Sequence, residues 1–377
     1  MPARRIHITC PAWSRQIFVN FEPTGVYNES GTHIGDIRYG EVPVEEGDIV
    51  FVGSMEWGLW RIRGDEEFVK FGWEETGFGK LISVRTKYKE VAKTIGMVSS
   101  NLIPRQSPPT QQDFDRAFAN SGDVTILHLN HDKLKVRDIS AALKTGSMLS
   151  LEIARGLTEK ECELLSMNRH LVNLKLGSAR ASDLKHLAGL TSLLWLELES
   201  LAAEDISFVA GMERLRVIDL NEVKVSDWSA LSNLRSLVAL YIWHSNLDDL
   251  RSLAGLDGLE ALELHGLPLT SLDGVERLTK LEALWLGEIE IDSLEPLAKL
   301  KNLFFLYLYD IPPLSLEPLA HLDKLTDIRI QVWDESHDQQ WEKLAEEFSR
   351  RRPDVEIEFG PDFFPPSYEG WGYPPEE

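Results

Sequence analysis

The residues of this chain that could carry out chemistry do not assemble into a catalytic set. The sequence contains none of the motifs G-x-S-x-G, H-E-x-x-H or C-x-x-C, and no glycine-rich phosphate loop. The usual signatures of hydrolases, metalloproteases, redox proteins and nucleotide-binding proteins are therefore absent. His244 and His265 lie near acidic residues, but two imidazoles without a third ligand do not define a metal site. The sequence predicts no enzyme, no metal and no cofactor, and these histidines are interpreted as ordinary exposed side chains.

A second group of residues combines aromatic rings with carboxylates, which is the chemistry of protein recognition. Trp and Tyr side chains offer a large contact area at a low entropic cost and dominate protein interfaces. Carboxylates attract basic partners. The candidate protein-binding residues are Trp195, Glu197, Glu199, Asp219, Tyr241, Trp243, Glu263, His265, Trp285, Phe305, Tyr307 and Tyr309. They form a site only if the fold brings them to one surface.

A repeated pattern, L-x-x-L-x-L, provides the framework for such a surface. Eight copies follow one another at steps of 22 residues, the first starting at Leu171 and the last at Leu325. Two looser copies, at 124–129 and 148–153, precede them. A fixed period of this length is the signature of a solenoid, in which each unit stacks on its neighbours. Residues 113–330 are therefore predicted to form a solenoid of about ten repeats.

Each repeat divides into a strand and a turn. Leu174 and Leu176 are two positions apart, so on a strand both point to the same face. In the second half of a repeat, apolar residues recur every three positions, as in Leu250, Leu253 and Leu256, which favours a 3₁₀ turn. That turn opens on Asp or Ser, whose side chains accept hydrogen bonds from orphan backbone N–H groups. The residues at this position are Asp183, Asp205, Asp227, Asp249, Ser271, Ser293 and Ser315.

These motifs resemble those of leucine-rich-repeat proteins, in their short, 22-residue, bacterial-type class. The resemblance covers residues 124–330. It implies an α/β solenoid with a curved parallel sheet on the concave side and short 3₁₀ or helical turns on the convex side. One feature departs from the family, in which an Asn or Cys after the strand often bonds the turn from inside. We expect apolar packing to hold the turn here instead. The corresponding residues are Ala179, Leu201, Val223, Ser245, Leu267, Ile289 and Ile311.

The candidate binding residues fall on the concave face, because they alternate along each strand with the inward-facing apolar residues. A solvated sheet surface without a function is expected to carry Lys, Glu, Thr or Ser. These positions hold three Trp, three Tyr and one Phe instead, so we favour binding. The alternative is that the rings pair laterally along the sheet and only stabilise it.

The charge of the chain is concentrated in the repeats and the segment after them. The formal net charge is −22, and residues 116–377 account for −19 of it. This balance argues against nucleic acid, whose phosphates require Lys and Arg, and favours a basic protein partner through electrostatic steering. The alternative is that the acidic surface only keeps the protein in solution. The sequence shows neither a membrane-spanning apolar run nor a secretory signal, so we expect no membrane association and a cytoplasmic location.

The segments on either side of the solenoid do not follow the repeat. Residues 1–112 are predicted to form a small β-rich N-terminal domain. Residues 331–377 are predicted to hold a capping helix at 338–352, a strand at 355–359 and a tail rich in Pro and aromatic residues. A cap is expected because the end repeat of a solenoid exposes an apolar face. The strands predicted in the first segment lie at 6–9, 16–21, 48–52, 59–62, 67–71 and 81–85.

These observations predict a non-enzymatic protein that binds another protein through an aromatic and acidic concave face. In its most concrete form, it is an inhibitor or immunity-type protein that masks a basic partner. One alternative is a scaffold or recognition subunit whose N-terminal domain does separate work. Another is an enzyme whose activity lies in residues 1–112, with the repeats selecting the substrate.

Overall fold

The structure, a computed structural model, describes residues 184–201, 205–332 and 335–360 without interruption, and most of residues 137–178. Before residue 137, it describes the backbone of the strands named below and a few residues between 111 and 115. The chain divides into two compact units, one covering Met1–Glu152 and the other Ile153–Phe363. Within this described part of the chain, no helix has the length and apolar character needed to cross a membrane.

The described backbone before residue 137 consists mainly of strands. They are β1 (Arg4–Pro11), β2 (Ile17–Val19), β3 (Glu22–Pro23), β4 (Ile37–Val44), β5 (Ile49–Val52), β6 (Leu59–Arg61), β7 (Glu66–Phe71), β8 (Lys80–Thr86), β9 (Glu90–Ile95) and β10 (Ile126–Leu129). The first nine pair in two sheets, of order β4-β1-β7-β8-β9 and β3-β2-β5-β6. Each strand predicted between residues 6 and 85 overlaps one of these. That residues 1–112 form a domain of their own stays a prediction.

Three of these strands, β3, β4 and β9, are missing from the sequence prediction. Strand β4 contains Gly40 and Pro43, and proline cannot donate a hydrogen bond to a sheet. The strand is tolerated because β4 lies at the edge of its described sheet, where it pairs antiparallel with β1. A position at a sheet edge is a tertiary property, so the sequence alone does not reveal it.

The strict repeats form a parallel sheet in which each strand starts 22 residues after its neighbour, and two strands before them and one after them extend the sheet. In the order of the sheet, β10 is followed by β11 (Ser150–Ile153), β12 (Asn173–Gly177), β13 (Trp195–Glu199), β14 (Val217–Asn221), β15 (Ala239–Trp243), β16 (Ala261–His265), β17 (Ala283–Gly287), β18 (Phe305–Tyr309), β19 (Asp327–Gln331) and β20 (Glu356–Phe359). Leu240 of β15 pairs with Leu262 of β16, so neighbouring strands align equivalent repeat positions. The predicted parallel sheet is confirmed.

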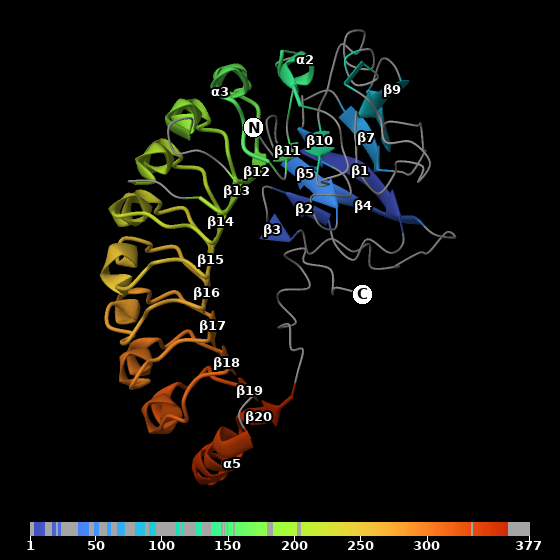
Figure 1. Ribbon diagram of the computed structural model, residues 1–377. Coiled ribbons are helices and arrows are strands. Elements are labelled where there is room, and N and C mark those ends of the chain that lie inside the picture. Colours follow the sequence, from blue (N-terminus) through green and yellow to red (C-terminus); the bar gives the residue numbers. More distant parts are fainter. Residues whose placement is uncertain are drawn as a thin grey trace. The chain divides into compact units, whose positions relative to one another are not determined.

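The apolar residues of the pattern form the core between the sheet and the turns. Leu240 and Ile242 are both 0% exposed. A helical turn is wider than the spacing of about 4.8 Å between strands. The stack of repeats therefore bends, with β12–β19 on its concave side and the turns on its convex side (Figure 1). The 3₁₀ helices are η2 (Lys185–Gly189), η3 (Ser207–Gly211), η4 (Ser229–Asn233), η5 (Leu250–Leu253), η6 (Val275–Arg277), η7 (Glu295–Lys299) and η8 (Glu317–His321).

Side chains at the start of the turns accept hydrogen bonds from the backbone N–H two residues later. The three aspartates accept at 2.7–2.8 Å and the three serines at 3.0–3.3 Å. The predicted capping role is confirmed for these residues, while Asp183 lies outside the described residues. The capping residues are Asp205, Asp227, Asp249, Ser271, Ser293 and Ser315.

Backbone hydrogen bonds close the turn that follows each strand. The residue directly after the strand is left-handed, and its N–H donates to the last carbonyl of the next strand, as His244 does to His265 at 2.8 Å. Below this turn, Val223 and Ile289 are buried, as apolar packing predicts. Ser245 is the polar member of that set, and its hydroxyl accepts from the Val223 N–H at 2.9 Å. We call the residues after the strands the left-handed column. They are Ser178, Ser200, Glu222, His244, Gly266, Glu288 and Asp310.

Two short helices precede the strict repeats. They are α2 (Ser140–Leu143) and α3 (Glu159–Ser166). Helix α3 begins at Thr158 in a capping box with Glu161, and Cys162 on the helix is buried. The sequence T-x-x-E predicts this helix start.

The predicted helix and strand at the far end are present as α5 (Glu335–Ser349) and β20. Trp341 and Phe348 of α5 are buried, and Nε1 of Trp341 donates to the carbonyl of Ile311 at 3.3 Å. Arg352 fastens the segment to the last convex turn, because its guanidinium donates to three backbone carbonyls at 3.0–3.3 Å. The acceptors are Ala320, Leu322 and Leu325. The end repeat is thereby covered, as a solenoid requires.

We expect Leu240→Asp to lower the free energy of unfolding by about 3–5 kcal/mol, because it places an unpaired charge in the core. Thermal melting followed by circular dichroism measures the effect. Arg235→Asp introduces the same side chain at an exposed position and serves as the control. Equal melting temperatures for the two variants would contradict the stacked core.

Candidate binding surface on the concave sheet

Three positions of every repeat strand face the concave side. The strand register sets equivalent positions of successive repeats side by side. All twelve sequence-predicted site residues therefore share one surface. The first column holds Trp195 and Phe305. The central column holds Glu197, Asp219, Tyr241, Glu263, Trp285 and Tyr307. The last column holds Glu199, Trp243, His265 and Tyr309.

Four of these residues are buried, which corrects the expectation that the whole set faces solvent. The exposed fractions of Asp219, Tyr241, Trp285 and Phe305 are 7%, 3%, 6% and 2%. The rings of Trp285 and Phe305 lie 5.4 Å apart on adjacent strands, so they cover each other. For this pair, the lateral stabilisation that we kept as an alternative is present. The partly exposed members are Trp195, Glu197, Glu199, Trp243, Glu263, His265, Tyr307 and Tyr309.

The last column contains a row of stacked rings. The centroids of Trp243 and His265 lie 4.9 Å apart, and those of His265 and Tyr309 lie 5.3 Å apart. The strand between His265 and Tyr309 carries Gly287 at this position. A Cβ atom on Gly287 would lie 2.3 Å from Cδ2 of His265 and 3.1 Å from Cδ1 of Tyr309. Glycine therefore allows the two rings to meet across an intervening strand, and the row of rings is continuous from Trp243 to Tyr309.

The central column contains two glutamates whose pKa values are raised. Burial and, second, the neighbouring Asp219 raise the pKa of Glu197 to about 8, although Lys175 acts in the opposite direction. Burial and Asp219 also raise the pKa of Glu263 to about 8. Both side chains are therefore largely protonated at neutral pH. This part of the concave face carries less negative charge than its composition suggests.

Near both ends of the concave face, a basic side chain pairs with carboxylates of the same chain. Lys175 forms an ion pair with Glu199, with 3.4 Å between Nζ and a carboxylate oxygen, and its ammonium group also donates a hydrogen bond to the carboxyl group of Glu197 at 2.5 Å. Arg329 pairs with Asp327 at 2.9 Å and also with Glu358 of β20. The surface thus has ion pairs at its two ends and stacked rings between them, an arrangement of apolar centre and polar rim that is common in protein interfaces.

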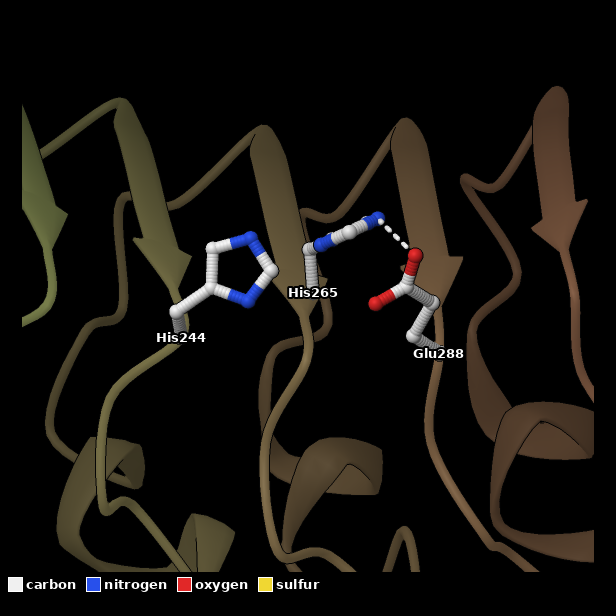
Figure 2. A group of neighbouring side chains, drawn as sticks. All are labelled: His244, His265 and Glu288. Atoms are coloured by element: carbon white, nitrogen blue, oxygen red, sulfur yellow. Dashed lines mark ion pairs between the residues drawn. The ribbon is translucent and has the colours of Figure 1, made fainter.

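A third potential metal ligand lies beside the two histidines that the sequence singles out. Glu288 follows β17 and faces His265, with 3.8 Å between Oε1 and Nε2 (Figure 2). Each of His244, His265 and Glu288 offers a ligand atom within 4.8 Å of the other two. The sequence prediction missed Glu288 because it considered only strand positions, and this glutamate belongs to the left-handed column. His244 and Glu288 occupy equivalent positions of two repeats, one on either side of the repeat that carries His265. Comparing the residues directly after each strand could therefore have revealed Glu288.

The 22-residue repeats and the curved parallel sheet together define the fold of the chain, which is that of leucine-rich-repeat proteins. No protein-family model and no curated protein sequence matches it. Among solved structures, the chain is similar to an internalin from Listeria monocytogenes str. 4b F2365, with 19% identity, a TM-score of 0.44, and coverage of 67% of this chain and 82% of that chain. It is similar to internalin C2 of the same strain, with 24% identity, a TM-score of 0.44, and coverage of 58% and 92%. It is also similar to a leucine-rich-repeat protein of Leptospira interrogans, with 20% identity, a TM-score of 0.48, and coverage of 63% and 72%.

The raised pKa of Glu263 predicts a stability that falls as pH rises. The folded protein holds this proton up to a pH of about 8, whereas an unfolded chain releases it near pH 4.5. Its contribution is therefore complete below pH 4.5 and is lost as the pH rises toward and through 8. We expect Glu263→Gln to flatten the decrease in melting temperature between pH 5 and pH 9, since Gln stays neutral.

Glu282→Gln, at an exposed position, is the matched control and should follow the wild-type curve. Melting curves of the wild type and Glu263→Gln that remain parallel over this range would exclude a proton held by Glu263.

Proposed function

We propose that the protein binds another protein through the concave face of the repeats and has no catalytic activity of its own. The observation that carries this proposal is the row of stacked, partly exposed rings in the last column, built from Trp243, His265 and Tyr309. Solenoids present extended concave surfaces of this kind to their partners. Rings already fixed by stacking lose little further freedom on binding, so a larger share of the contact energy becomes affinity.

The exposure of each residue divides the surface into contacting and supporting side chains. Trp195, Trp243 and Tyr307 keep part of their rings accessible and can touch a partner directly. Trp285 and Phe305 are buried, so their contribution is to hold the strands and the neighbouring rings in place. Hot spots in interfaces are typically such anchored Trp and Tyr side chains near the centre of the patch.

We expect Trp243→Ala and Tyr307→Ala each to weaken binding by about 2 kcal/mol, roughly 30-fold in Kd. The loss of folding stability should be smaller than in Trp285→Ala, which removes a buried ring. A partner captured with the wild-type chain from its native host is titrated against each variant by calorimetry, and melting is measured on the same samples.

Arg251→Ala changes a highly exposed side chain in η5 on the convex side and should leave Kd unchanged. A variant lacking the rings of both Trp243 and Tyr307 that folds and binds at full strength would remove the concave face as the site. In that case, residues 1–112 become the segment to test.

The charge of the surface supports a more specific form of the proposal. In this form, the partner is basic, and this protein masks it as an inhibitor or immunity-type protein. Residues 116–377 carry a formal net charge of −19, and the central column brings Glu197, Asp219 and Glu263 to nearby strands. A Lys or Arg side chain of the partner placed over this column would favour the ionised carboxylates. Binding would then release the protons that Glu197 and Glu263 hold at neutral pH.

This form predicts that binding tightens as the pH rises from 6 to 8, by up to about tenfold per pH unit for each proton released. Calorimetry in buffers of different ionisation enthalpy counts the protons, and Glu263→Gln should reduce the count by about one. Association should also slow as salt concentration rises, with a smaller change in dissociation. A Kd that is independent of both pH and salt would argue for a neutral partner.

A further inference from the structure

We propose that His244, His265 and Glu288 form a binding site for a transition-metal dication such as Zn²⁺. The three residues come from three successive repeats and converge at the end of the strands (Figure 2). His265 is the last residue of β16, while His244 and Glu288 directly follow β15 and β17. The rings of the two histidines meet edge to face, with 5.1 Å between their centroids. The site shares His265 with the proposed protein-binding surface, but metal binding goes beyond that function and is measured without a protein partner.

The glycine in the left-handed column leaves the space that one of the ligands fills. His244 and Glu288 stand on either side of Gly266, which has φ +59°. A left-handed backbone favours glycine, yet Ser, Glu, His and Asp occupy the equivalent position in other repeats. The fold therefore does not demand glycine there. A Cβ atom on Gly266 would lie 2.3 Å from Nδ1 of His244, so its absence is what allows the imidazole to lean over the neighbouring repeat toward His265.

His265 is held in a form that suits metal binding. Trp243 and Tyr309 stack with its ring, which fixes the orientation that a metal ligand needs. Its Nε2 faces Glu288, and its Nδ1 is buried and has no hydrogen-bond partner. The ring stack thus holds the imidazole with one nitrogen toward Glu288, as a shared metal ion requires.

The ligand chemistry selects the class of ion. Two imidazoles and one carboxylate suit Zn²⁺ and its transition-metal neighbours, whereas Mg²⁺ and Ca²⁺ prefer all-oxygen sites. In a tetrahedral zinc site with bonds of about 2.0–2.1 Å, ligand atoms lie roughly 3.3 Å apart. Here they lie within 4.8 Å of one another. His244 and Glu288 are exposed, so rotation of their side chains can supply the contraction. Three protein ligands leave a fourth position for water or for a ligand atom of another molecule.

Zinc titration of the full chain without an affinity tag tests the site. Binding of Zn²⁺ is measured by competition with a chromogenic chelator, and melting is measured with and without the ion. We expect one ion per chain that depends on the site, with affinity weakened at least tenfold by His265→Ala and by Glu288→Gln. Excess Ca²⁺ should not displace it. Gly266→Ala should also weaken binding, because the added methyl group occupies the space of the His244 ring.

Two features of the design separate the site from general effects. Glu288→Gln changes an exposed side chain by a single group, so it tests the ligand without disturbing the ring stack around His265. His321→Ala removes an exposed imidazole of the convex turns and should retain wild-type affinity and wild-type stabilisation by Zn²⁺. The proposal is overturned if the His265→Ala/Glu288→Gln double variant, folded by its melting curve, binds Zn²⁺ as tightly as the wild type.

Discussion

In-register stacking of 22-residue repeats is the constraint on which the rest of this structure depends. Each strand donates and accepts backbone hydrogen bonds with equivalent residues of its neighbours, and the left-handed column extends that ladder by one rung beyond the strand. The same register aligns the buried leucines. Because Leu240 lies beside Leu262 and Ile242 beside Leu264, two apolar rows run through the solenoid. A slip of one residue would turn these rows out to solvent.

The register also determines what the concave surface can be. A column of side chains at the spacing of adjacent strands, about 4.8 Å, brings like groups close together. For aromatic side chains this closeness is favourable, and Trp243 and His265 stack. For carboxylates it is unfavourable. Burial is the main cause that raises the pKa of Glu197 and of Glu263, and the negative charge of Asp219 in the same column adds to it. The register thus accounts for the stacked rings and for part of the rise in these pKa values.

The sequence predicts the solenoid well because its determinants are local and repeated. The spacing of Leu250 and Leu253 predicts a 3₁₀ turn, Asp249 predicts its cap, and T-x-x-E at Thr158 predicts a helix start. Each of these depends on residues within one turn of chain. Strand β4 with its Pro43 is missed because the prediction needs the position of the strand in a sheet.

The candidate site is predicted less well, since its properties depend on contacts between repeats. The positions of the concave residues follow from the alternation along each strand, and all twelve reach the same surface. Their exposure does not follow from it: Trp285 and Phe305 are buried because large rings on adjacent strands cover each other. The approach of Glu288 to His265 is also invisible in a reading limited to the strands. It arises because Glu288, directly after β17, lies beside His265, the last residue of the neighbouring strand β16.

Because neighbouring repeats stack in the same register, whole repeats can be added to or removed from most of the solenoid without breaking the stack. A whole repeat added or lost elsewhere in the solenoid leaves the register between the remaining repeats of the same kind, so stacking alone does not fix the number of repeats. The cluster of His244, His265 and Glu288 is different, because its members occupy three consecutive repeats and are not interchangeable. A unit inserted among them would move two of the three apart by a further strand spacing. The proposed metal site therefore requires these three repeats to stay consecutive.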